Sequence, residues 1–314
     1  MSGYAEEIKN CCEVVLATEC DYDKCAEIFM NAIFYILENK MNFGKGVLIE
    51  GINNIDAEII SWEDKSIDYS KYDCLILRSV WGYQDKYLEF REWLQMIKNK
   101  NILLLNHPDI IINNIQKNKQ CSILKKNNIP FINTSFVYNE DDLLERLDLN
   151  RLTVIKPIIS GSGENTYLIN QNNLSNLRNI LNGLKKIFIQ NDNGIMIQPY
   201  FNGIENGEYA CIFIDGINTH NMLRFPGVFS EKKRPIYLSS VPDCVKKIAN
   251  DVSKLEEFSG YLYMRVDIVL QNGNPIIMEV ELAEPDLLFK YIENDSVRNQ
   301  GIKLLSKSIV RRIK

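Results

Sequence analysis

Three carboxylates near the end of the chain are spaced for metal-ion chemistry. Asp267 lies in the run MRVDIVL, and Glu279 and Glu281 lie in IIMEVELAEP. Alternate residues of a strand project from the same face, so Glu279 and Glu281 point together, and a hairpin turn around Gly273 brings the strand of Asp267 beside them. Such carboxylates hold Mg²⁺ when phosphates complete its coordination. A solvated edge strand could carry the same pattern, but the apolar flanks make unpaired charge expensive and favour a metal site.

A lysine and a small-residue loop form a second pattern. Lys156 lies near the end of the run VIKP, and Ser160, Gly161, Ser162 and Gly163 follow it. A lysine at the end of a strand can reach a phosphate as a point charge, and small residues let backbone N–H groups approach it. The GKS/T ending of a Walker loop is missing, and an ordinary turn would also explain the small residues.

A strand that runs into a proline supplies a third pattern. Gln198, Pro199 and Tyr200 close the run IMIQPY, and Glu208 lies beyond them. Backbone groups left unpaired past a proline can bind the edge of an adenine, although a plain edge strand fits equally well.

Two arginines are candidates for contact with phosphate. Arg224 lies in MLRFP, and Arg265 stands two residues before Asp267. A guanidinium offers several N–H donors to an anion, which suits a group that holds a transferring phosphoryl. The alternative for each is an exposed ion pair, which contributes little to stability.

Three residues after an apolar strand could recognise a substrate. Arg78, Trp81 and Tyr83 combine a cationic clamp for a carboxylate with an aromatic wall, which would suit a small amino acid. A core position fits Trp81 as well. The histidines His107 and His220 are expected to be structural.

The first third of the chain alternates strands with helices. We expect a strand at Val14–Ala17 and helices at Cys25–Asn39 and Tyr87–Lys98. Further strands are expected at Ala57–Ser61, Cys74–Leu77 and Leu103–Leu105. This alternation is typical of a parallel sheet, whose functional groups lie at the carboxyl ends of the strands.

The remainder of the chain has a different rhythm. A change in polarity over Asn106–Asn114 indicates a boundary, and a helix is expected at Lys117–Lys126. Turns such as Asp215-Gly216 and Asn272–Asn274 separate the later strands and favour an α+β region with antiparallel hairpins. Those strands are expected at Ser135–Tyr138, Thr153–Lys156, Ile195–Gln198, Tyr209–Ile214, Met264–Leu270 and Pro275–Glu281.

In this order the patterns resemble the ATP-grasp superfamily of carboxylate–amine ligases over nearly the whole chain. The runs YMRVDIV and MEVELAEP carry the resemblance near the C-terminus. The chain is similar to the branch that contains the cycloserine-forming O-ureidoserine ligase, and it also resembles glutathione synthetase-like enzymes. The features shared with that branch are Ala17-Thr18, Trp62-Glu63-Asp64, the segment Asp68 to Asp73, and the run LRSVWGY from Leu77 to Tyr83.

The resemblance implies an ATP-grasp fold, α/β plus α+β, preceded by a Rossmann-like domain. Residues 1–112 would form this N-terminal domain, residues 113–198 the central lobe or lid, and residues 199–314 the C-terminal lobe with the metal site. The two lobes would grip ATP between antiparallel sheets.

The resemblance also implies a role for each matching residue. Lys117 and Lys156 would bind phosphates, with Lys119 as a rival for the first. The loop Ser160–Gly163 would cover the phosphates. The residues from Gln198 to Phe201 would form the adenine hinge, with Glu208 as a ribose or hinge ligand.

The same comparison implies the reacting end of the site. Arg224 and Arg265 would hold the γ-phosphate or an acyl phosphate. Asp267, Glu279 and Glu281 would bind Mg²⁺. Two ions are expected, and Mn²⁺ could replace them.

The chain also departs from the superfamily. The segment after Arg224 lacks the usual arginine and paired glycines, and the cations from Lys232 to Arg234 are candidates to replace them. Residues Ile28–Asn54 are longer than the first helix of the family. This insertion could alter the substrate cleft or form a subunit contact.

The reaction implied is ATP-dependent joining of a carboxylate to an amine through an acyl phosphate. A phosphotransferase on the same scaffold is the alternative among enzymes. A nucleotide-binding protein without turnover is the alternative from another class.

Composition fits a protein of this kind. The 314 residues carry a formal net charge of −5, with 46% apolar and 25% charged residues, so no basic surface for nucleic acid is expected. The eight cysteines include no CxxC pair, and no apolar run reaches membrane length. We expect a cytoplasmic enzyme that acts on a small amino acid or short peptide, with no nucleic-acid or membrane partner. A homodimer remains open.

Overall fold

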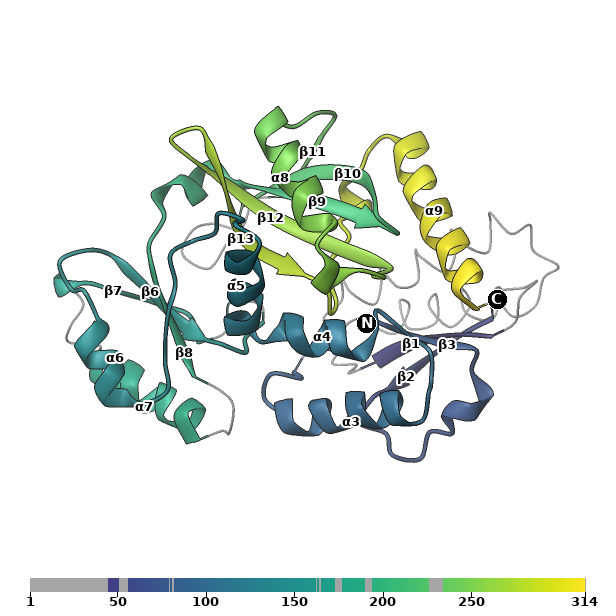
Figure 1. The fold of residues 1–314 in the computed structure, drawn as a ribbon, viewed down its shortest axis with the longest axis horizontal. Helices are drawn as coiled ribbons and strands as arrows, with labels where there is room; N and C mark the ends of the chain where they lie inside the picture. The colour runs from purple at the N-terminus through teal and green to yellow at the C-terminus, as the bar shows by residue number, and fades with distance from the viewer. Residues whose placement is uncertain are drawn as a thin grey trace, which may run out of the picture.

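A computed structural model describes residues 45–50, 56–78, 80, 82–161, 163, 165–172, 177–189, 194–225 and 234–313. The strand and helix expected at Val14–Ala17 and Cys25–Asn39 lie outside these residues, as do Ala17-Thr18 and most of the insertion Ile28–Asn54. The described chain forms three sheets, flanked by helices (Figure 1). In the described part no helix is both long and apolar enough to cross a membrane.

The first sheet has the order β2-β1-β3-β4. Its strands are β1 (Lys45–Glu50), β2 (Asp56–Ser61), β3 (Cys74–Leu77) and β4 (Leu104–Leu105). Strand β1 pairs antiparallel with both β2 and β3, whereas β3 and β4 are parallel. The predicted parallel pairing is therefore confirmed for β3 and β4. Strand β1 was not predicted, and it runs antiparallel to both of its neighbours, so the sheet as a whole is mixed. Only a short segment joins β1 to β2, and such a segment permits an antiparallel hairpin but no crossover.

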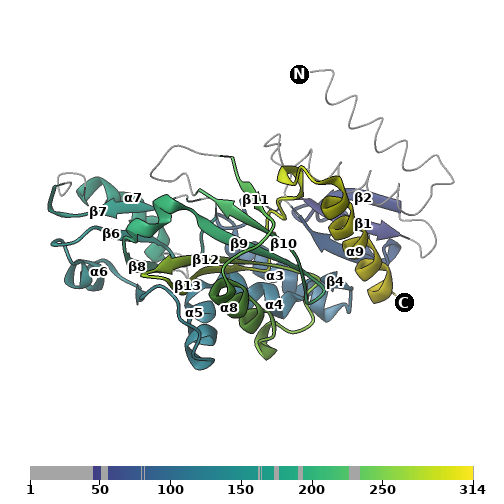
Figure 2. The same ribbon diagram turned by 90° about the horizontal axis from the view of Figure 1, so that it is seen from above.

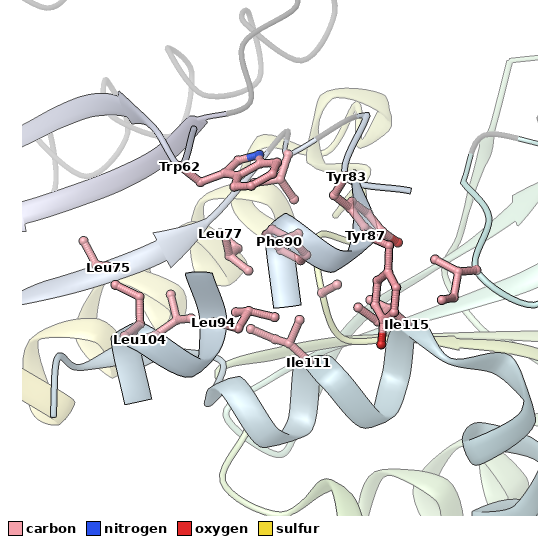
Figure 3. Packing of buried hydrophobic residues seen from close by; sticks show 14 of the residues in the cluster. Trp62, Leu75, Leu77, Tyr83, Tyr87, Phe90, Leu94, Leu104, Ile111 and Ile115 are labelled. Carbon is pink, nitrogen blue, oxygen red and sulfur yellow. The ribbon is translucent and has the colours of Figure 1, made fainter. Parts of the chain in front are cut away.

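The core beside this sheet combines aliphatic and aromatic side chains (Figure 3). Helix α3 (Tyr87–Asn99) buries Tyr87, Phe90, Leu94 and Ile97, which recur at the helical spacing of three and four residues. The ring of Phe90 lies 5.1 Å from that of Trp62, edge to face. These contacts hold the loop after β3 against a rigid layer.

A helical segment leads from the first sheet to the second. Helix α4 (Pro108–Ile115) begins with His107 as its N-cap, whose ring Nδ1 accepts a hydrogen bond from the Asp109 amide. Helix α5 (Lys117–Lys126) follows after one residue. The expected domain limits at 112 and 198 fall inside α4 and inside strand β8 (Ile195–Pro199), and the division into domains stays a prediction.

The second sheet has the order β5-β8-β6-β7. It consists of β5 (Ser135–Val137), β6 (Thr153–Pro157), β7 (Tyr167–Ile169) and β8 (Ile195–Pro199), all paired antiparallel. Helices α6 (Glu140–Arg146) and α7 (Leu177–Ile189) cover one face of it, at the lower left of Figure 1.

The third sheet has the order β11-β10-β9-β12-β13 and is antiparallel throughout. Its strands are β9 (Glu208–Ile214), β10 (Ile217–Arg224), β11 (Ile236–Leu238), β12 (Tyr263–Gln271) and β13 (Asn274–Glu281). Helix α8 (Asp243–Ser253) packs on one face and α9 (Asp295–Ile313) on part of the other (Figure 2). Four short 3₁₀ helices complete the described structure: η1 (Tyr69–Lys71), η3 (Asn202–Asn206), η4 (Glu256–Phe258) and η5 (Phe289–Tyr291).

The outer edge of β13 is covered by side-chain amides and by one extended segment. Asn114 and Gln120 both donate to the Val280 carbonyl, and Gln120 also accepts from the Val280 amide. Asn114 accepts from the Leu282 amide just beyond the strand. Ile277 exchanges two backbone hydrogen bonds with residues 130–132. The strand that carries the candidate metal ligands is therefore hydrogen-bonded along both edges.

Candidate active site

Three parts of the chain meet where the candidate residues lie. The buried cluster beside the first sheet includes Ile158 and Ile159 from the end of β6, and Ala283 from the end of β13. The same cluster includes Val80, which follows β3. The ends of β3, β6 and β13 therefore converge, although they are distant in sequence.

One face of the third sheet gathers most of the charged candidates. In the β12–β13 pairing, Asp267 stands opposite Glu279 and Arg265 opposite Glu281. Alternate residues share a face, so all four side chains lie on the same side of this hairpin. A bulge directly after Asp267 ends this regular alternation. The register places the three carboxylates on one face of the hairpin, as the alternation of strand residues predicted, while their convergence on a metal ion stays a prediction.

Strands β9 and β10 extend that face. Asp267 stands opposite Ala210, and Glu208, two residues before Ala210, stands opposite Arg224. Because Ala210 is small, it leaves room above the sheet for the longer charged side chains around it.

Asp267 is the buried centre of this cluster. Its side chain is only 2% exposed. Arg265 Nε donates to its two oxygens at 3.0 and 3.1 Å, and Arg224 Nη1 donates to Oδ2 at 3.0 Å. Burial lowers the pKa of Arg265, but Asp267 and the nearby glutamates outweigh burial and raise that pKa. Both candidate arginines therefore contact the same carboxylate.

Glu279 is held by a lysine from another part of the chain. Lys117, at the start of α5, donates from Nζ to Glu279 Oε1. Burial raises the pKa of Glu279, but Lys117 and Lys156 outweigh burial and hold this pKa at about 2. Likewise, burial lowers the pKa of Lys117, while Glu279 and Glu281 raise it overall. This is a charge-assisted, mostly buried ion pair.

A pocket adjoins this ion pair. Its apolar part comes from residues such as Leu124, Met196 and Ile277, and its charged end is formed by Lys117, Lys156 and Glu279. The remaining lining residues are Gln120, Cys121, Phe131, Ile132, Thr134, Gln198 and Met278. The pocket has a volume of about 20 Å³ in this conformation, so it must widen before a nucleotide base can enter. Apolar walls with two lysines at one end are the lining that a flat base attached to an anion requires.

Lys156 enters the pocket from β6. Burial lowers its pKa, with Glu279 opposing this effect and Lys117 adding to it. Lys119 does not line the pocket, so the geometry favours Lys117 over this rival.

The expected adenine hinge is only partly at the pocket. Gln198 lines it and donates from Nε2 to Thr134 Oγ1 at 2.8 Å. Pro199 ends β8, and the Tyr200 amide donates to the Leu152 carbonyl at 2.9 Å. Pro199, Tyr200 and Phe201 are absent from the described lining of the pocket.

Glu208 lies at the start of β9 and is buried. Its Oε1 lies 3.4 Å from Arg224 Nη1. Burial and the nearby Asp267 raise the pKa of Glu208 to about 7, against the opposing effect of Arg224. A carboxyl in this state can donate a hydrogen bond at neutral pH as well as accept one.

The small-residue loop after β6 packs towards the first sheet. Gly163 has a φ of 75°, a conformation that glycine adopts without strain. The side chain of Gln84 packs against Gly161. Its nearest atoms would lie 3.6 Å from a Cβ placed on this glycine, which is an ordinary van der Waals distance. Ser160 and Gly161 are partly exposed, and Ser162 lies outside the described residues.

The expected substrate residues occupy different environments. Tyr83 is buried with its ring 5.1 Å from that of Phe90. Burial raises the pKa of Tyr83, and the charges of Glu281 and Glu284 add to this effect. Arg78 is also buried, and its guanidinium carbon lies 5.4 Å from the centre of the Tyr263 ring. Trp81 lies outside the described residues.

The donors fit Mg²⁺ in chemical type and in register, because Asp267 and Glu279 are cross-strand neighbours with hard oxygen ligands. Their present side-chain positions serve ion pairs instead. Within the described ranges, no group of three or more His, Cys, Asp and Glu side chains surrounds a common point. Glu281 Oε1 accepts from the Ala283 amide at 3.1 Å. The metal assignment therefore remains a prediction.

Other polar residues fall outside the reacting face. His220 is buried, donates from Nε2 to the Leu287 carbonyl at 2.7 Å and has a pKa lowered by burial to about 4, which agrees with a structural role. Arg234 is exposed and lies 3.9 Å from Glu293. Lys232 and Lys233 lie outside the described residues.

Some site residues were not foreseen from the sequence. Glu284 belongs to the recognised run MEVELAEP, yet no role was assigned to it; its Oε2 accepts from the Val80 amide at 2.7 Å. Cys121 and Thr134 line the pocket although no local pattern marks them.

Comparison with known proteins gives consistent matches. The family model described as D-cycloserine synthetase DcsG, N-terminal domain, matches residues 51–106. The chain is 22% identical over 266 residues to the cycloserine biosynthesis protein DcsG of Streptomyces lavendulae, covering 78% of this chain and 86% of that protein.

Comparison with solved structures agrees with these sequence matches. D-cycloserine synthetase DcsG superposes with a TM-score of 0.66 at 19% identity, over 81% of this chain and 88% of that one. A D-alanine–D-alanine ligase from Bacillus anthracis has a TM-score of 0.56 at 19% identity, over 81% and 86%. The ATP-grasp ligase PsnB has a TM-score of 0.51 at 14% identity, over 74% and 78%.

Proposed function

We propose that this chain, which has the ATP-grasp fold, is an ATP-dependent ligase that joins a carboxylate to an amine and releases ADP and phosphate. The observation that carries the proposal is the pocket whose charged end is shared by Lys117, Lys156 and Glu279. Beside it lies the face of Arg224, Arg265 and Asp267. The similarity to DcsG, a cycloserine biosynthesis protein, supports the same class of reaction.

The reaction consists of two transfers. A carboxylate oxygen of the first substrate attacks the γ-phosphorus of ATP, and the bond to ADP breaks. The amine nitrogen of the second substrate then attacks the acyl carbon, loses a proton and expels phosphate. Neither transfer needs a nucleophilic side chain, so the protein acts by orientation and by stabilising charge.

The residues divide these tasks by position. In the proposal, Lys117 and Lys156 bind the phosphates that extend from a base in the pocket. Arg224 and Arg265, both buried or half-buried beside Asp267, hold the oxygens of the transferring group. Asp267, Glu279 and Glu281 are the groups that would hold Mg²⁺, which supplies neutralisation of phosphate charge when bound.

Several finer points belong to the same proposal. The substrates are small amino acids or short peptides, the metal is two Mg²⁺ ions replaceable by Mn²⁺, and the enzyme acts in the cytoplasm. Gln198 to Phe201 and Glu208 bind the nucleoside, and the loop Ser160–Gly163 covers the phosphates. Tyr83 and Trp81 line the substrate.

The decisive experiment incubates the protein with Mg-ATP and pairs of small amino acids. Phosphate release and product mass are measured together with the nucleotide formed. Amine-dependent ADP release with an amide product is expected. ADP release with a stable phosphorylated product would indicate a phosphotransferase, nucleotide binding without turnover would indicate a non-catalytic protein, and AMP would exclude the acyl-phosphate route.

A matched pair of arginine variants adds a control. Arg224→Gln should abolish most turnover, because it removes a donor from the transferring group. Arg151→Gln changes an exposed arginine that pairs with Asp148 and should keep wild-type turnover. Equal losses in both variants would contradict the division of roles.

A further inference from the structure

Arg78 has a buried guanidinium that the protein satisfies on only one side. It directly follows β3 and is 4% exposed. Nη1 donates to the Pro285 carbonyl at 2.8 Å. Nε and Nη2 are buried and have no hydrogen-bond partner in the described part of the chain. A buried cationic donor left in this state is destabilising, which calls for a partner outside the described chain.

The two unsatisfied donors lie on the same edge of the guanidinium. Nε–H and the adjacent Nη2–H point in parallel, and this edge matches the two oxygens of a planar carboxylate. The charge of Glu281, which acts on Tyr263 and Glu284 beside Arg78, disfavours a more highly charged phosphate at the same point. The geometry of the edge and its surroundings therefore select a carboxylate.

This edge lies beside the reacting face. The carbonyls of two successive residues receive the two arginines: Pro285 accepts from Arg78, and Asp286 accepts from Arg265 Nη1 at 3.4 Å. Glu284, which precedes them, accepts a hydrogen bond from the Val80 amide. Burial and the nearby Glu281 raise the pKa of Glu284 to about 8, so its carboxyl group can exchange hydrogen bonds with an amine. A cationic edge and a carboxyl group thus stand next to each other, where they can bind the two ends of an amino acid.

We infer that Arg78 binds the carboxylate of the amino acid that supplies the amine, with Glu284 near its amino group. This inference rests on the proposed ligase function. A carboxylate whose two oxygens both accept hydrogen bonds is a poor nucleophile towards phosphorus. The carboxylate bound by Arg78 is therefore the one that the product retains. The product is then a linear amide with a free carboxylate, formed between two molecules. Since neither donor is exposed, residues 284–286 must shift to admit the substrate.

The test compares amine donors that differ only at the carboxylate. Wild-type enzyme with Mg-ATP and an acyl-donor amino acid is given alanine or alaninamide, and serine or serinamide. The amides should show a KM raised about 10- to 100-fold, since each loses charge-assisted hydrogen bonds. Equal use of acid and amide by the wild-type enzyme would overturn the inference.

Variants of Arg78 separate binding from a structural role. Arg78→Lys keeps the charge without the two-donor edge, and Arg78→Gln removes both. Each should lose the preference for acid over amide, whereas the exposed Arg151→Gln should keep it. An active Arg78 variant that retains the preference would overturn the inference. If neither variant folds, the wild-type comparison of acid with amide decides alone.

Failure of the proposed function gives a different result. If no amide forms from any pair, the ligase assignment falls. The Arg78 site is then judged by the thermal shift of wild-type protein with Mg²⁺, a non-hydrolysable ATP analogue and either alanine or alaninamide. Stabilisation by the acid alone supports the carboxylate site, and absence of that difference overturns it.

Discussion

The charged residues of the candidate site neutralise one another before any ligand binds. Asp267 is paired with Arg224 and Arg265, and Glu279 with Lys117. These cations are the groups that we assign to phosphate, and the carboxylates are those that we assign to the metal. Binding of Mg-ATP would therefore exchange internal partners for external ones of the same charge, which limits the cost of desolvation.

Removing one member of the Lys117–Glu279 pair should be more harmful than removing both. Lys117→Met leaves the partly buried Glu279 carboxylate without its partner, and we expect a loss of about 1–3 kcal/mol in the free energy of unfolding. Adding Glu279→Gln should recover much of this loss. Urea denaturation of the two single variants and the double variant measures the coupling.

The pH dependence gives a further check on this pair. The pKa of Glu279 lies at about 2 in the folded protein, below its ordinary value of 4.5, so its contribution is fully present above pH 4.5 and is lost as pH falls towards 2. The loss in free energy of unfolding that Lys117→Met causes should therefore become smaller as pH falls from 4.5 towards 2. Lys119→Met is the control, because this exposed lysine does not line the pocket; an equal loss of stability there would contradict a specific pair.

At the scale of single elements, β13 depends on residues far from it in sequence. Its edge is bonded by the amides of Asn114 and Gln120 and by the segment around Phe131. This strand bears Glu279 and Glu281, so the same bonds position the candidate metal ligands.

We expect Asn114→Ala to destabilise the protein by about 1–3 kcal/mol, because it leaves the buried Leu282 amide without its partner. Thermal or urea unfolding measures the change. Ser122→Ala, on the exposed side of α5, serves as the control and should stay near wild type. A near-neutral Asn114→Ala would show that water or a neighbour replaces the amide.

Most regular elements could be predicted from local sequence. The strand at Cys74–Leu77 and the helix at Lys117–Lys126 have the predicted bounds, because apolar runs and helical periodicity are local signals. The segment Asn106–Asn114 was predicted as a boundary, yet it contains most of α4. Its asparagines suggested a loop. Asn106 and Asn114 instead bond β12 and β13, more than 150 positions away in the chain, and no local pattern could indicate such partners.

At the scale of the whole molecule, the predicted ATP-grasp fold is confirmed by the structures it resembles. The Rossmann-like character of the N-terminal domain stays a prediction, since β1 reverses direction within the described sheet. The order of chemical motifs along the chain was enough to predict the fold. The ion pairs were not predictable, because they depend on side-chain positions from several strands of the third sheet and from helix α5.

Ligand binding at the junction of these parts should stabilise the whole protein. We expect Mg²⁺ alone to change the melting temperature little, because Asp267 and Glu279 already have cationic partners. ATP with Mg²⁺ should add about 2.7 kcal/mol at a hundredfold excess over Kd, and EDTA should reverse most of the gain. Differential scanning fluorimetry measures each state. A shift of equal size without Mg²⁺ would remove support for the metal assignment.

The covered edge of β13 also bears on self-association. A long, open strand edge is a template on which a second molecule can add a strand, and such contacts lead to aggregation. In the third sheet one edge is β13, which is already bonded by Gln120 and Asn114, and the other is the three-residue β11. Amide hydrogens at Val280 and Leu282 should therefore exchange with solvent only when the lobe opens as a whole. The side-chain amides of Asn114 and Gln120 position the strand that carries Glu279 and Glu281. They also prevent a second molecule from adding a strand at this edge.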